Sequence, residues 1–171
     1  MDSLSDPGSL RERADVAFRE ERSVDERDGF EYFASIQGMV AVGITNEAAE
    51  VLLMNSPHGW RLPYGPVGTD EDWVDAGRHV GEELTGVDVG IDRVERVGQT
   101  IHCLNGDETR ETTSYDVILR ARTVEGSPIA GDPSFGPWDE LEMGWFDAVP
   151  DDAYWDHGDA VDDIRRFVTG E

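Results

Sequence analysis

Residues 65–87 read GPVGTDEDWVDAGRHVGEELTGV, and this stretch predicts a loop that leads into an amphipathic helix. Thr69 is the expected N-cap, because Asp72 follows three positions later in a capping-box pattern. Gly86 is the expected C-terminal stop. At about 100° per residue the apolar side chains form one stripe that should pack on a sheet: Trp73, Ala76, Gly77, Val80 and Leu84.

Segments on both sides of this helix have strand-like patterns. The sequence predicts strands at residues 30–34, 39–45, 50–54, 87–97, 114–123 and 141–146, with a hairpin between the second and third. Residues 58–67 and 126–137 are rich in Pro and Gly and predict irregular loops. Residues 151–168 predict a closing helix. This order predicts an α+β or α/β sandwich around a mixed β-sheet.

The N-terminal segment differs from the rest in its charge and weak periodicity. Residues 9–28 predict a charged helix with a weak apolar stripe, followed by a solvated run. We therefore expect an N-terminal helix or arm over residues 1–29 and a single domain over residues 30–171.

The chain is strongly acidic. Its 171 residues carry 38 Asp and Glu against 14 Arg and no Lys, for a formal net charge of −24. Such a surface repels phosphate backbones and anionic lipids, which argues against nucleic-acid and membrane partners. A dense carboxylate surface without Lys suits a salt-rich cytoplasm, so we interpret the chain as a halophile protein. The 38% hydrophobic content argues against disorder.

A cytoplasmic location is also expected from the remaining composition. Cys103 is the single cysteine, which excludes an intramolecular disulfide. Residues 1–13 are polar, and the longest near-apolar run, residues 38–44, is too short to span a bilayer.

The segment from Trp60 to Val87 resembles the Nudix box. That box reads Gly, five residues, Glu, seven residues, Arg-Glu, an aliphatic residue, any residue, Glu-Glu, any residue, Gly and an aliphatic residue. Counted from Gly65 without gaps, the matches are Glu71, Glu83, Gly86 and Val87, and the departures are His79, Val80, Gly81 and Leu84. A register shifted by one matches Arg78, Val80, Glu82 and Glu83, but it breaks the spacing to Gly65 and Glu71 and needs one extra residue before Gly86. The ungapped register keeps the spacing and is the one we favour from the sequence.

The resemblance spans residues 35–150 and implies a Nudix-like α/β/α sandwich. It also implies a hydrolase that cleaves the diphosphate linkage of a nucleotide or nucleoside diphosphate derivative with Mg²⁺ or Mn²⁺. Hard cations on carboxylate oxygens neutralise the phosphates and orient the attacking water. In the ungapped register the family's ligand positions correspond to Val80, Glu83 and Leu84, which leaves one carboxylate of three.

By this resemblance Glu83 and Glu82 are the candidate catalytic residues, and Glu71 and His79 are further candidate metal ligands. Helix geometry places Asp72, His79 and Glu83 on one flank, where they could border a metal or a phosphate. The alternative is a solvated acidic flank. For Glu71, which points away from this flank, helix capping is the alternative.

The candidate substrate-binding residues are Arg61, Tyr64, Gly65 and Arg78. Arginines bind phosphate through paired hydrogen bonds, and aromatic rings such as Tyr64 or Trp60 can stack on a base. Surface ion pairing and core packing are the alternatives, and they apply equally to Arg110. Loop carboxylates could complete the site, although surface charge explains them as well: Glu108, Glu111, Asp132, Asp139, Glu140 and Glu142. His58, His102 and His157 show no ligand spacing.

Two functions therefore compete. One is a Mg²⁺-dependent Nudix-type hydrolase with a divergent site, and the other is a Nudix-fold module that binds a nucleotide or metabolite without catalysis. Both predict a small-molecule partner, and the resemblance allows a homodimer. A third hypothesis, a structural or partner-binding subunit, rests only on the charged N-terminal helix.

Overall fold

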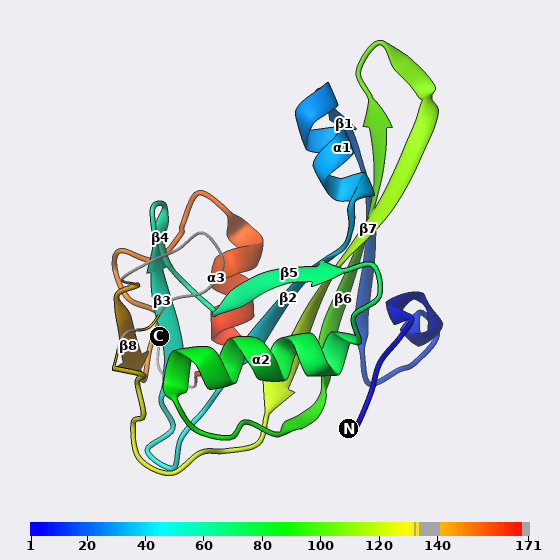
Figure 1. Cartoon of the computed structure of the whole chain (residues 1–171). Helices are drawn as coiled ribbons and strands as arrows, with labels where there is room; N and C mark the ends of the chain where they lie inside the picture. The colour runs from blue at the N-terminus through cyan, green and yellow to red at the C-terminus, as the bar shows by residue number, and fades with distance from the viewer. Residues whose placement is uncertain (132, 134–140, 169–171) are drawn as a thin grey trace.

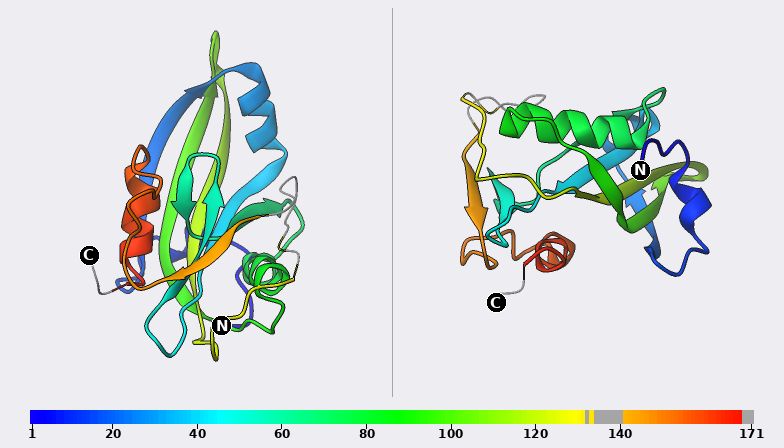
Figure 2. Two further views of the ribbon diagram at one scale, coloured as in Figure 1. Left: turned by 90° about the vertical axis from the view of Figure 1, so that its left-hand side faces the viewer. Right: turned by 90° about the horizontal axis from the view of Figure 1, so that it is seen from below.

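The protein is built around a mixed five-stranded sheet with helices on both faces. The structure is a computed structural model and describes residues 1–131, 133 and 141–168. The sheet has the order β1-β6-β7-β2-β5, in which β1 is parallel to β6, β7 is parallel to β2, and the other two pairs are antiparallel. Its strands are β1 (Ala17–Asp25), β2 (Ile36–Gly43), β5 (Tyr64–Gly68), β6 (Ile91–Leu104) and β7 (Asp107–Ala121). Helix α2 (Trp73–Thr85) covers one face and helix α3 (Gly158–Arg165) the other (Figures 1 and 2). This confirms the predicted sandwich.

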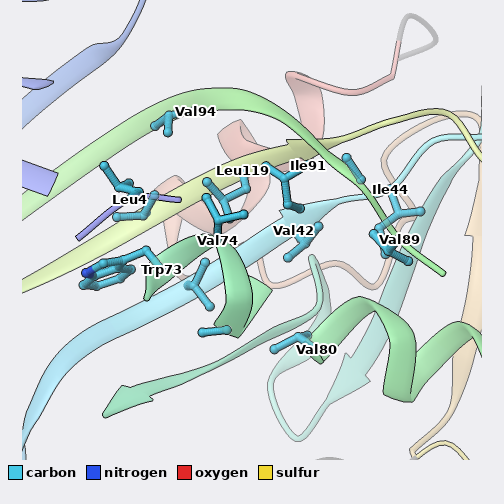
Figure 3. Packing of buried hydrophobic residues seen from close by; sticks show 14 of the residues in the cluster. Leu4, Val42, Ile44, Trp73, Val74, Val80, Val89, Ile91, Val94 and Leu119 are labelled. Atoms are coloured by element: carbon cyan, nitrogen blue, oxygen red, sulfur yellow. The ribbon is translucent and has the colours of Figure 1, made fainter. Parts of the chain in front are cut away.

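Helix α2 packs its predicted apolar stripe on the sheet. Trp73, Val80 and Leu84 are fully buried and join the main core cluster, as Figure 3 shows for Trp73 and Val80 among strand residues such as Val42 and Leu119. A Cβ on Gly77 would approach the Leu119 side chain to 2.6 Å, so the absence of a side chain there lets the helix lie close to the sheet.

The two ends of α2 agree with the sequence to different degrees. Gly86 is the C-cap in the left-handed conformation, at φ 76°, as predicted. The N-cap is Asp72 and not Thr69, because the Asp72 carboxylate accepts hydrogen bonds from the backbone N–H groups of Val74 and Asp75. The helix therefore begins one turn later than the capping-box pattern indicated.

A second, three-stranded antiparallel sheet has the order β4-β3-β8. Its strands are β3 (Val51–Ser56), β4 (Gly59–Arg61) and β8 (Met143–Phe146). The predicted hairpin of β2 and β3 is thus divided between two sheets, joined by a bridge between Thr45 and Val51. Residues 58–67, predicted to be irregular, instead contain β4 and the start of β5. Pro66 is tolerated in β5 because that strand lies at a sheet edge.

The N-terminal predictions were wrong in two places. Residues 17–25 form strand β1 and not a helix, and they pair with β6 over their whole length. Leu4, Leu10 and Val16 are buried in the main core cluster, so this segment belongs to the core and is not a separate arm. Residues predicted as a strand at 30–34 lie in helix α1 (Arg27–Ala34), which packs on β7, β2 and β6. A 3-10 turn, η1 (Pro7–Leu10), precedes β1.

The closing helix α3 is shorter than predicted and packs on the sheet through a second core cluster. Ile164 and Val161 lie there with Leu53 and Ile118. Among the described residues, no helix has the length and apolar character needed to cross a membrane.

Candidate functional site

The burial pattern of α2 bears on the register of the Nudix-like box. Val80 and Leu84, which occupy metal-ligand positions in the ungapped register, are 0% exposed and pack in the core. Glu82 is half-buried and Glu83 is exposed, so both carboxylates lie outside the core. In the shifted register Val80 takes the aliphatic position and Glu82 and Glu83 take the paired-glutamate positions. Burial therefore favours the shifted register over the one we preferred from the sequence.

Two carboxylates of the predicted metal site are used by the backbone before α2. Glu71 Oε1 accepts a hydrogen bond from Gly68 N at 2.9 Å and closes the turn that leads to the helix. Asp72 Oδ1 caps the helix, and its Oδ2 accepts from Leu4 N at 2.8 Å, which fastens the N-terminal segment to α2. Glu71 therefore stabilises the turn before the helix and does not cap it, and N–H groups occupy both oxygens of Asp72.

The remaining candidates on α2 lie on its outer side. His79 Nδ1 and Glu83 Oε1 are 4.0 Å apart, one helical turn from each other. Glu82 Oε2 accepts from Val89 N at 3.2 Å, and Arg78 lies on the exposed side of the helix. Mg²⁺ and Mn²⁺ prefer several oxygen ligands. No group of three or more His, Cys, Asp or Glu side chains within the described residues is arranged to hold a metal ion, so these residues do not fit the implied cation.

The loop carboxylates that the structure describes do not add to this set. Glu111 pairs with Arg22 at 2.7 Å, Glu142 accepts from Asn55 Nδ2, and Glu108 is exposed on the β6–β7 hairpin. Asp132, Asp139 and Glu140 lie outside the described residues.

A cavity of about 330 Å³ lies between the main sheet and α3, away from α2. Two of the predicted substrate-binding residues, Arg61 and Tyr64, line it. The other lining residues come from α1, β2, β6, β7 and the segment around α3, and they include Phe33, Met39, Arg96, Asp116, His157 and Asp159. This volume is within the range of small-molecule sites.

Arg61 is the polar group in this cavity with an unmet hydrogen bond. Its guanidinium carbon lies 3.9 Å from the centroid of the Tyr64 ring, and its Nε is buried without a hydrogen-bond partner. Burial raises the pKa of the Tyr64 phenol, so this ring stays neutral beside the cation. Buried donors are normally satisfied, and an unsatisfied one costs about 1–3 kcal/mol. An acceptor atom on a bound molecule would remove this cost.

Arg96 forms the base of the cavity with the sheet and α3. Its guanidinium donates to both oxygens of Asp163 at 3.0 and 2.9 Å and to Asp116 at 2.8 Å. Burial alone would lower the pKa of Arg96, but hydrogen bonds and charges from Asp163 and Asp116 raise it above its ordinary value. The pair ties α3 to β6 and satisfies the charge of Arg96 internally, so Arg96 is not a free phosphate ligand.

The structure therefore divides the predicted site residues. Arg61 and Tyr64 meet in the cavity, whereas Gly65, Arg78, Glu71, His79, Glu82 and Glu83 do not line it. Trp60 is buried against Phe146 and packs in the second core cluster. Arg110 lies over the ring of Phe30. Sequence reasoning missed Phe33, Arg96 and His157, since each comes from a different element and no local motif joins them.

Comparison with known proteins identifies the fold. No family model and no curated protein matches the chain. Among solved structures, the E. coli dihydroneopterin triphosphate pyrophosphohydrolase aligns over 78% of this chain and 96% of that chain, with 15% identity and a TM-score of 0.52. A MutT protein from Methanosarcina mazei Go1 aligns over 86% and 94% with 20% identity and a TM-score of 0.47. A Nudix hydrolase from Nitrosomonas europaea aligns over 77% and 70% with 19% identity and a TM-score of 0.46. The alignment with the first of these structures, which has a TM-score above 0.5, supports the Nudix-like sandwich fold described above.

Proposed function

We propose that the protein binds a small molecule of nucleotide type in the cavity between the sheet and α3. The observation that carries this proposal is the buried Arg61 Nε without a partner, at a cavity wall that also offers the Tyr64 ring. Phosphate oxygens are the acceptors that a guanidinium binds most strongly, and aromatic rings provide a surface for a base.

The charges of the cavity constrain how such a ligand lies. Asp116 and Asp159 line the same cavity as Arg61 and would repel an anionic group. Asp159 is held in its charged form, because a hydrogen bond from Arg19 lowers the pKa of its carboxyl. The anionic end of the ligand therefore belongs beside Arg61, and its hydrogen-bond donors belong beside the carboxylates.

Binding can be measured directly by titration calorimetry in molar KCl with AMP, GMP and ADP-ribose. Arg61→Gln should weaken binding about tenfold or more, because it removes a charge-assisted hydrogen bond. Arg13→Gln is the matched control, since Arg13 is exposed, pairs with Asp15 and does not line the cavity. Absence of binding to all three compounds, or an equal loss in both variants, would refute the proposal.

Hydrolysis of a diphosphate linkage, the activity that the box implies, is the second candidate. It is favoured by one observation: the Glu82–Glu83 pair lies outside the core on α2, where the shifted register expects paired glutamates. No group of three or more His, Cys, Asp or Glu side chains among the described residues is arranged to hold a metal ion, so a reaction that depends on Mg²⁺ or Mn²⁺ requires ligands beyond this arrangement.

The two candidates are separated by turnover. Release of AMP and ribose 5-phosphate from ADP-ribose, measured with and without Mg²⁺ or Mn²⁺, should fall to background in Glu83→Gln if α2 carries catalysis. Glu108→Gln, an exposed carboxylate on the β6–β7 hairpin, is the control. If the wild type binds a nucleotide but does not hydrolyse ADP-ribose, the hydrolase function is refuted and the binding function is retained.

A further inference from the structure

A buried histidine is held at both ring nitrogens next to the cavity. His102, on β6, is 4% exposed. Its Nδ1 lies 2.5 Å from Asp25 Oδ2, and its Nε2 lies 2.7 Å from Ser114 Oγ. Asp25 Oδ1 also accepts from Ser23 Oγ at 2.5 Å. A ring hydrogen-bonded at both nitrogens cannot rotate without breaking a buried hydrogen bond, so its plane is fixed.

The sheet brings these three residues together from three strands. Ser23 of β1 is level with His102, which places Asp25 two positions further along the same side. Ser114 lies on β7, two positions from Thr112, the residue opposite His102. A serine hydroxyl can donate or accept, so it satisfies Nε2 whichever nitrogen carries the proton. No sequence spacing joins residues 25, 102 and 114, which explains why sequence analysis assigned His102 no role.

The same three residue types form the nucleophile, base and orienting acid of serine hydrolases. Here Ser114 is only 6% exposed, and it does not line the cavity. A nucleophile must reach its substrate, so the geometry points away from attack by Ser114 and towards orientation of the histidine ring.

The face of the His102 ring is covered by Phe33. The two rings are stacked, with centroids 4.3 Å apart and planes 11° from parallel. Phe33 belongs to α1 and lines the cavity. The start of α1 is also fastened to the end of β6, because Asn105 N donates to Asp25 O and Asn105 Nδ2 donates to Glu26 Oε1. Asp25 thus both orients His102 and anchors the chain that carries Phe33.

We propose that His102, fixed by Asp25 and Ser114, is a positioning residue that holds Phe33 as a stacking wall of the cavity. The wall selects ligands that carry a planar ring, such as a nucleobase. This inference rests on the proposed binding function and deepens it, since it assigns the base-binding side of the cavity. The network acts through Phe33 and does not itself contact the ligand.

The experiment compares ligands that differ only in the base. The dissociation constants of AMP, GMP and ribose 5-phosphate are each measured. The dissociation constant of ribose 5-phosphate divided by that of the nucleotide reports the stacking contribution. Phe33→Leu should lower this ratio about tenfold, because base stacking on an aromatic side chain contributes at this level. Ser114→Ala and Asp25→Asn should each lower it about threefold or more while leaving ribose 5-phosphate binding unchanged, since the first frees Nε2 of the ring and the second replaces the charged acceptor at Nδ1 with a neutral amide.

Three further variants test whether the network acts through Phe33. Ser114→Thr keeps a hydroxyl and should restore the ratio. Thr109→Ala, which removes an exposed hydroxyl on the β6–β7 hairpin, should leave it unchanged. In a Phe33→Leu background, Ser114→Ala should have no additional effect on the ratio, because the effects of two mutations that act through the same side chain do not add. Near-ultraviolet circular dichroism identifies any variant that has lost its fold.

The outcomes are distinct. A wild-type protein that binds no nucleotide overturns the proposed function together with this inference. A wild-type protein that binds AMP or GMP, with folded Ser114→Ala and Asp25→Asn variants of unchanged ratio, overturns the inference alone. A loss that is equal for nucleotide and ribose 5-phosphate assigns the network a purely structural role and also overturns it.

Discussion

At the scale of single residues, Arg96 shows how charge stabilises a cavity in a chain with so few cations. It is 4% exposed at its side chain and bonds two carboxylates, one of which, Asp163, is itself buried on α3. A buried ion pair adds little net stability over an apolar pair, but breaking it leaves an uncompensated charge. The Arg96–Asp163 pair therefore mainly fixes the position of α3 on the sheet, and with it the shape of the cavity.

Replacement of Arg96 tests this. Arg96→Met should lower the free energy of unfolding by about 3–5 kcal/mol, because Asp163 would keep only the longer contact to Arg166 Nε at 3.7 Å. The free energy is measured by chemical denaturation at constant KCl. Arg93→Met is the control, since the Arg93 side chain is 60% exposed and its pair with Glu95 should contribute about 1 kcal/mol or less. Equal losses in the two variants would contradict the buried-pair argument.

At the scale of elements, the start of α2 joins three parts of the chain. Asp72 caps the helix, and its second oxygen holds Leu4, while Trp73 N donates to Leu4 O at 2.9 Å. Gln37 of β2 donates to the carbonyls of Gly68 and Glu71 before the helix. The N-terminal segment is therefore fixed to the sheet through α2.

This arrangement predicts different effects at the two capping candidates, Asp72 and Thr69. Asp72→Ala should lower the unfolding free energy by about 1–2 kcal/mol or slightly more, since it removes the cap and the Leu4 contact together. Thr69→Ala should change it by less than about 0.5 kcal/mol, because Thr69 is exposed and lies outside the helix. Thermal unfolding of the two variants measures the difference. A larger effect at Thr69 would restore the capping box expected from the sequence.

The elements also show what the sequence could predict. The stripe of α2, its glycine stop and the central strands were predictable, because burial imposes a period that can be read locally. Strand β1 was not, since AFREERSVD has no apolar alternation and is ordered by parallel pairing with a strand over seventy positions away. Arg61 and Tyr64 were predicted because they flank the box. Phe33, Arg96 and His102 were not, since their partners come from distant segments.

At the scale of the whole molecule, the acidic surface dominates. The net charge is −24, because the chain has 38 Asp and Glu but only 14 Arg. Many of the carboxylates are exposed. Repulsion among like charges destabilises the compact state, and salt screens it over a Debye length of about 10 Å at 0.1 M and about 3 Å at 1 M. The halophile interpretation therefore predicts that the stability of the protein depends on the salt concentration.

The thermal midpoint should rise steeply as KCl increases from about 0.1 M to about 2 M, where screening is nearly complete. Salt can also stabilise by strengthening apolar burial, so the cause must be separated. A variant with five exposed carboxylates neutralised, Glu47→Gln, Asp70→Asn, Asp88→Asn, Asp92→Asn and Glu108→Gln, removes charge without touching the core. If repulsion is the cause, this variant is more stable than the wild type at low salt, and the two midpoints converge at high salt. Parallel curves for the two proteins would assign the effect of salt to apolar burial, and the carboxylate surface would then serve solubility alone.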